Sequence, residues 1–163
     1  MGRDSLSMKI LMILFFPDLN VWLALSVSEH EHNKEAWSWV RLLPTEANLI
    51  FSRYTQLGLL RLLTNRAVMG EQTLTLKQGW DVYEEWLRDP RVEFYPEPRG
   101  LDAAFRQATA PFDRERASKL IGDCYLLAYS QQANAALVTF DRALLRAAQR
   151  LGCSAVVPGW RST

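Results

Sequence analysis

The sequence predicts an α/β fold with a mostly parallel central sheet. Short apolar runs that lack polar alternation are separated by longer segments with helical periodicity, which is typical of strands covered by helices on both faces. No repeat, low-complexity block or Gly/Ser linker interrupts the 163 residues, of which 48% are hydrophobic and 23% charged. A chain of this length suits one domain and should bury roughly 68–70% of its unfolded surface.

The first expected strand is the apolar run at residues 10–16. A buried helix is the alternative for such a run, but the polar stop at Pro17 and Asp18 favours a strand. Four further strands are expected at residues 49–51, 92–95, 135–140 and 155–157.

Helices are expected between these strands, where apolar side chains recur every three to four residues. Their predicted ranges are 20–27, 35–43, 55–63, 74–87, 101–108, 124–133 and 141–151, with Gly122 and Asp123 opening the sixth. Because strands and helices alternate, the connections favour parallel pairing, and a site is expected outside the carboxyl ends of the strands.

Composition excludes several classes of protein. Cys124 and Cys153 cannot form a disulfide framework, and no Cys/His cluster has zinc spacing, so a reducing, cytoplasmic location is expected. A net charge of +1 excludes a strongly basic coat for nucleic acid and leaves room for a local basic groove.

The N-terminal segment resembles a signal peptide only superficially. The apolar run follows Lys9 but ends at Pro17-Asp18 without a small-residue cleavage site, and it is too short to cross a membrane. We therefore expect no membrane association. Residues 1–8 are expected to be a flexible extension or an alternative start, with Met8 as a second initiator, and residues 9–160 a single domain.

Three aspartates occupy the predicted strand ends and helix starts. Asp18 follows the first strand, Asp141 follows the fourth with Thr139 just before it, and Asp123 precedes the helix that leads into the fourth strand. If the first and fourth strands are neighbours, these carboxylates converge, and short oxygen ligands suit Mg²⁺ or Mn²⁺. The alternative is that each aspartate caps a helix, since Asp is a favoured N-cap residue.

Four segments carry a recognisable pattern: residues 17–25 read PDLNVWLAL, residues 55–65 TQLGLLRLLTN, residues 123–128 DCYLLA and residues 137–142 LVTFDR. In this order they resemble the PIN-domain ribonucleases, particularly VapC-type toxins of type II toxin–antitoxin systems. The resemblance covers about residues 10–157, nearly the whole chain.

The resemblance implies a three-layer α/β/α sandwich and a magnesium-dependent endoribonuclease in which Mn²⁺ can substitute. It also implies an RNA substrate, a cognate antitoxin and a homodimer. By position, Asp18 and Asp123 would bind the metal directly, and Asp141 directly or through water. Asn20 would brace the loop that carries Asp18, and the Thr139 hydroxyl would hydrogen-bond within the site.

One position departs from the pattern. Many PIN domains carry a glutamate on the third helix, where this chain has Gly58, with uncharged Gln56 nearby. Weak alternative sources of a fourth carboxylate are Glu46, Asp113 and Glu115. The departure leaves a second hypothesis open, a catalytically weak or inactive PIN-fold module that binds RNA or protein. An unrelated nucleotide binder or small hydrolase is disfavoured, because the chain lacks a Gly-rich phosphate loop and a Gly-x-Ser-x-Gly elbow.

Basic and aromatic side chains complete the candidates. Arg61 and Arg142, with Arg53 and Arg66 near the same edge, are candidates for binding RNA phosphates, and Arg61 could equally neutralise the aspartates. The tryptophans on predicted helices are expected to be core residues or anchors for an amphipathic segment of the antitoxin: Trp37, Trp39, Trp80 and Trp86.

Overall fold

A computed structural model describes residues 12–159 and contains one five-stranded sheet in which every strand pairing is parallel. The strand order is β3-β2-β1-β4-β5. The strands are β1 (Ile13–Pro17), β2 (Ala47–Phe51), β3 (Val92–Phe94), β4 (Ala136–Val138) and β5 (Ala155–Val156). The expected extension at residues 1–8 lies outside the described residues, as do the first two residues of the predicted first strand.

The central strand β1 pairs with both β2 and β4. Phe15 lies opposite Leu49 of β2 and also opposite Ala136 of β4. The first and fourth strands are therefore neighbours, as the convergence of the aspartates requires. The chain builds the sheet outward in one direction through β2 and β3 and in the other through β4 and β5, so β1 and β4 flank the point where the order reverses.

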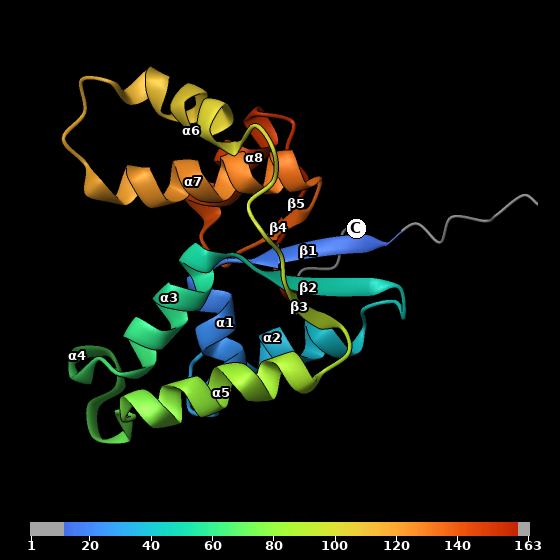
Figure 1. Ribbon diagram of the computed structural model, residues 1–163, viewed down its shortest axis with the longest axis vertical. Helices are drawn as coiled ribbons and strands as arrows, with labels where there is room; N and C mark the ends of the chain where they lie inside the picture. Colours follow the sequence, from blue (N-terminus) through green and yellow to red (C-terminus); the bar gives the residue numbers. More distant parts are fainter. Residues whose placement is uncertain (1–11, 160–163) are drawn as a thin grey trace, which may run out of the picture.

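Helices cover both faces of the sheet and produce a three-layer α/β/α sandwich, as predicted (Figure 1). One layer contains α1 (Leu19–Ser26), α2 (Asn33–Arg41), α3 (Arg53–Leu63), α4 (Arg66–Met69) and α5 (Leu76–Arg88). The other contains α6 (Leu101–Thr109), α7 (Ser118–Ala133) and α8 (Arg142–Arg150). No helix in the described range is long and apolar enough to cross a membrane.

Each face of the sheet has its own apolar core. On the α1/α3/α5 side, the fully buried Trp22 stacks on Phe51 with ring centroids 3.7 Å apart. On the α6/α7/α8 side, Phe16 contacts Tyr129 at 4.4 Å. Alternate residues of the strands thus point into opposite cores, which explains the apolar runs without polar alternation.

The largest difference from the predicted elements is the start of α7. The helix begins at Ser118, so Asp123 lies in its second turn and does not open it. The prediction failed because Gly122 suggested a boundary, whereas this glycine is helical and allows close approach of Tyr54. Two short 3₁₀ turns, Gly70–Gln72 and Ala110–Phe112, were also not predicted.

Candidate functional site

Asp18 stands at the junction between β1 and α1. Its backbone N–H donates to the Val138 carbonyl of β4 at 2.9 Å, which extends the β1–β4 pairing to the site. Its Oδ1 accepts from the Val21 N–H at 3.0 Å and caps α1. The residue is only 5% exposed, and burial raises its pKa to about 6 from the ordinary 3.8.

The hydroxyl of Thr139 links Asp18 to Asp141. Thr139 is fully buried after β4 and donates its hydroxyl hydrogen to Asp18 Oδ2. The Thr139 hydroxyl oxygen in turn accepts from the Asp141 N–H at 3.0 Å. These two hydrogen bonds hold the loops after β1 and β4 in one arrangement. The bond from the Thr139 hydroxyl also opposes the rise in the pKa of Asp18 that burial causes.

Both carboxylate oxygens of Asp141 have donors. Oδ1 accepts from the N–H groups of Ala143 at 2.8 Å and Leu144 at 3.1 Å, which caps α8. Oδ2 lies 3.0 Å from the ammonium of Lys119, in the first turn of α7. This hydrogen bond with Lys119 is the main reason that the pKa of Asp141 lies below its ordinary value.

Asp123 differs from the other two aspartates because it caps no helix. Its carboxylate accepts no hydrogen bond from any described residue, and burial raises its pKa. Lys119 opposes that rise, whereas the negative charge of Asp141 adds to it. Helix capping therefore accounts for Asp18 and Asp141 in part, and does not account for Asp123.

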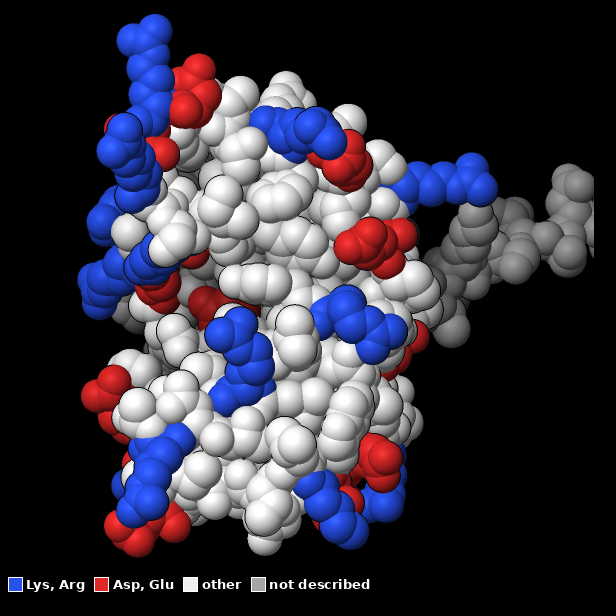
Figure 2. Space-filling view, turned by 60° about the vertical axis from the view of Figure 1, so that its left-hand side comes forward, with Lys and Arg blue, Asp and Glu red and all other residues white. Residues whose placement is uncertain are grey.

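The three aspartates form one electrostatically coupled group at the carboxyl edge of β1 and β4. Asp141 raises the pKa values of both Asp18 and Asp123. Figure 2, which faces this edge, shows acidic side chains recessed in a hollow with Lys and Arg side chains projecting around it.

The donor set suits a hard divalent cation, since it offers carboxylate and hydroxyl oxygens and no competing sulfur or imidazole. Carboxylates that raise one another's pKa gain from a shared cation. Nevertheless, no three Asp, Glu, His or Cys side chains within residues 12–159 lie close enough to hold one ion together in this conformation.

Asn20 contributes through its backbone. Its N–H stabilises the ionised form of Asp18, while its exposed side chain makes no hydrogen bond with any residue that the structure describes. The expected bracing of the Asp18 loop therefore comes from the Thr139 hydroxyl and the first N–H groups of α1.

The absence of a carboxylate on α3 has a steric counterpart. A Cβ atom at Gly58 would lie 2.1 Å from Leu19 Cδ2 and 2.8 Å from Leu19 Cδ1, so the Leu19 side chain fills the space that a residue at 58 would need. Gln56 is buried on another face of α3, where it hydrogen-bonds with Arg53 and Tyr83.

None of the weak candidates supplies the missing charge in this structure. Glu46 precedes β2 and so lies at the amino edge of the parallel sheet, opposite the site. Asp113 and Glu115 are exposed on the segment between α6 and α7, and neither is among the described charges that shift the pKa values of the three aspartates.

The arginines divide into separate environments. Arg61, on α3, lies close enough to affect the pKa of Tyr54, which also responds to Asp123 and Asp18. Arg53 instead lies over the Phe94 ring at 4.5 Å, and Arg66 pairs with Glu71 at 4.0 Å. Arg142 is exposed at the start of α8, immediately after Asp141.

Sequence reasoning missed two residues of the site, Tyr54 and Lys119. An alanine at 122 would place its Cβ 2.4 Å from the Tyr54 hydroxyl, so Gly122 is what lets this phenol reach α7 beside Asp123. A glycine inside a helix costs about 1 kcal/mol relative to alanine, and this was the available signal that something approaches closely there. For Lys119 no comparable sequence signal exists.

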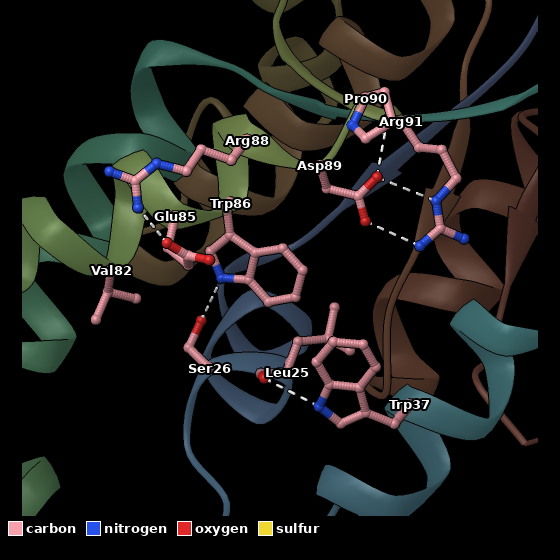
Figure 3. A pocket seen from close by; sticks show the side chains of 10 residues that line it. All are labelled: Leu25, Ser26, Trp37, Val82, Glu85, Trp86, Arg88, Asp89, Pro90 and Arg91. Atoms are coloured by element: carbon pink, nitrogen blue, oxygen red, sulfur yellow. Dashed lines mark hydrogen bonds and ion pairs between the residues drawn. The ribbon is translucent and has the colours of Figure 1, made fainter.

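A second candidate site is an apolar groove of about 800 Å³ among α1, α2 and α5. Trp37 and Trp86 stack in its wall with ring centroids 5.6 Å apart, and their indole N–H groups donate to the Leu25 carbonyl and the Ser26 hydroxyl (Figure 3). The pairs Glu85–Arg88 and Asp89–Arg91 give the groove a charged rim. Because the indoles are fixed by hydrogen bonds, the groove is preformed.

The sequence and the fold both resemble those of known proteins. Residues 15–150 match the PIN domain family. The chain is 38% identical over 135 residues to Ribonuclease VapC41 of Mycobacterium tuberculosis, a match covering 77% of this chain and 88% of that protein. A similar fold occurs in VapBC2 of Rickettsia felis bound to a promoter DNA fragment (TM-score 0.64, 11% identity, 89% of this chain and 98% of that chain). It also occurs in the sarcin-ricin loop cleaving toxin VapC20 of Mycobacterium tuberculosis (TM-score 0.61, 15% identity, 82% and 94%). The chain therefore belongs to the PIN-domain family, within its VapC group.

Proposed function

We propose that the protein is the toxin of a toxin–antitoxin pair, an endoribonuclease that acts in the cytoplasm and hydrolyses RNA phosphodiester bonds with Mg²⁺, or with Mn²⁺ as a substitute. The observation that carries the proposal is the coupling of Asp18, Asp123 and Asp141 at one edge of the sheet. The 38% identity to a named ribonuclease supports it.

Asp18, Asp123 and Asp141 are the residues that would hold the cation. When bound, the ion would polarise the phosphodiester and lower the pKa of a bound water. Thr139 keeps Asp18 and the Asp141 loop in register, and Asp123 is the carboxylate with most freedom to take up a new ligand. Arg61 and Arg142 are proposed to bind RNA phosphates beside the aspartates.

The test is cleavage of end-labelled structured RNA, including transfer RNA, with Mg²⁺, Mn²⁺ or a chelator. Asp123→Asn is the informative variant because Asp123 caps no helix and accepts no hydrogen bond from the described residues. Its matched control is Asp113→Asn, the same change at an exposed aspartate outside the cluster.

We expect Asp123→Asn to lose at least about 100-fold in the rate of cleavage, as for other losses of electrostatic stabilisation of a transition state, while Asp113→Asn retains the wild-type rate. Cleavage that persists equally in the wild type, Asp123→Asn and Asp18→Ala would indicate a contaminating nuclease. RNA binding without cleavage under any condition would instead support the alternative, a PIN-fold binding module, for which the uncharged Gly58 position is the favouring observation.

We also propose that the groove walled by Trp37 and Trp86 receives an amphipathic segment of the antitoxin. Preformed apolar grooves with aromatic walls bind such segments through spaced apolar anchors, and the solved structures with this fold include toxin–antitoxin complexes. Co-purification with the product of the adjacent small reading frame tests this. Val82→Glu, in the groove, should abolish co-purification, whereas Leu76→Glu, at the exposed start of α5, should not. A homodimer stays a prediction that light scattering of the purified chain would check.

A further inference from the structure

Lys119 brings a positive charge into the acidic site from the first turn of α7. Its ammonium lies 3.0 Å from Asp141 Oδ2. Asp141, followed by Asp123, raises the pKa of Lys119, so the negative charges of both carboxylates act on this side chain. The Lys119 side chain is 74% exposed, whereas that of Asp141 is 26% exposed, so the lysine can move away without disturbing the packing.

The position of this lysine is otherwise unfavourable. The amino end of a helix carries a partial positive charge, and a cation there is destabilising by a few tenths of a kcal/mol. Its neighbours in the first turns of α7 provide no acidic side chain before Asp123. The contact that holds Lys119 in place is therefore its ion pair with Asp141.

Lys119 also completes the set of donors around Asp141. Two backbone N–H groups engage Oδ1, and the ammonium engages Oδ2. A metal ion that uses Oδ2 must displace the ammonium, because two cations cannot approach the same oxygen closely without strong repulsion.

We propose that Lys119 is a tethered cation that competes with the divalent ion for Asp141 and neutralises the acidic site from within when no ion is bound. The inference rests on the proposed function in taking Asp18, Asp123 and Asp141 as the ion's site. It adds that Lys119 lowers the affinity of the site for the metal ion. The ammonium reduces the negative charge available to an incoming ion, and it must leave Asp141 before that carboxylate can become a ligand.

The test is the affinity of the RNA-free full chain for Mn²⁺, measured by isothermal titration calorimetry. Lys119→Met removes the charge and keeps most of the stem, and we expect Mn²⁺ to bind about tenfold more tightly because a nearby unit charge no longer repels the ion. Lys119→Arg keeps the charge and should stay within about twofold of wild type.

Lys77→Met is the matched control. Lys77 pairs with Asp81 on α5 at 2.8 Å, so this change also removes one lysine and one Lys–Asp pair, but at an exposed pair outside the acidic site. It should leave the Mn²⁺ affinity within about twofold of wild type.

Unchanged or weaker Mn²⁺ binding in Lys119→Met would overturn the competition, as would equal tightening in Lys77→Met. If Lys119→Met binds Mn²⁺ and the wild type binds none, the competition is supported. If neither protein binds Mn²⁺, the competition is overturned. The nuclease assay separates the two proposals. If the wild type cleaves RNA with a metal ion but Lys119→Met has an unchanged Mn²⁺ affinity, only the proposed role of Lys119 is refuted.

Discussion

Gly58 and Leu19 provide a direct test of why α3 carries no carboxylate. A Cβ added at Gly58 would lie 2.1 Å from Leu19 Cδ2, 2.8 Å from Cδ1 and 3.0 Å from Cγ, all inside contact distance. Gly58→Ala therefore has two opposing effects on the free energy of unfolding. Alanine in a helix interior is favoured over glycine by about 1 kcal/mol, and forcing an extra carbon against Leu19 costs about 1–3 kcal/mol.

The two effects separate in a double-mutant cycle. In the wild-type background, Gly58→Ala should be neutral or destabilising by up to about 2 kcal/mol, which is the difference between the packing and helix contributions. In a Leu19→Ala background the clash is gone, so the same change should stabilise by about 1 kcal/mol. The coupling between the two positions should thus be about 1–3 kcal/mol.

Urea unfolding followed by circular dichroism measures all four variants. Gly79→Ala is the matched control, a helical glycine whose added Cβ would meet Leu60 and Thr64 at an ordinary 3.5 Å, and it should stabilise by about 1 kcal/mol. If Gly58→Ala has the same effect in both backgrounds within about 0.5 kcal/mol, Leu19 does not fill that space and our explanation for the missing carboxylate fails.

Three further predictions concern the acidic site. Burial raises the pKa of Asp18 to about 6 in the folded protein, so the folded state binds this proton more tightly than the unfolded state does. The free energy of unfolding of the metal-free protein should therefore fall by up to about 3 kcal/mol as the pH rises from about 4 to 7. Urea unfolding in the presence of a chelator across that range should show that the free energy of unfolding depends less steeply on pH in Asp18→Asn than in the wild type. An unchanged pH dependence would contradict the raised pKa of Asp18. Thr139→Val leaves Asp18 Oδ2 without its donor and should destabilise by about 1–3 kcal/mol, with a higher Asp18 pKa by NMR titration; a lower pKa would refute this role of the hydroxyl. Asp141→Ala should lower the free energy of unfolding by about 1 kcal/mol, because it removes the α8 cap. Asp141→Asn should keep that stability but lose metal affinity. Equal losses of stability in both variants would mean that capping does not depend on the side-chain oxygen.

The local elements were largely predictable because their signals are local. The apolar runs located all five strands, within one to three residues at most ends, and the N-cap preference of aspartate matches the caps at Asp18 and Asp141. Asp123 was correctly associated with α7 but misplaced at its start, since a glycine inside a helix has the same local pattern as a boundary. Tyr54 was missed because its approach to Gly122 joins α3 to α7 across the site.

By itself, the sequence determined the alternation of strands and helices, the aspartates at the strand ends and the family to which these motifs point. Only the tertiary structure decided that β1 lies beside β4, that Leu19 takes the space next to Gly58 and that Lys119 forms an ion pair with Asp141. The physical reason is range: periodicity and capping depend on neighbours within a few residues, whereas these contacts depend on which faces pack together. The Lys119–Asp141 pair joins residues 22 positions apart and exists only because both helices begin at the same edge of the sheet.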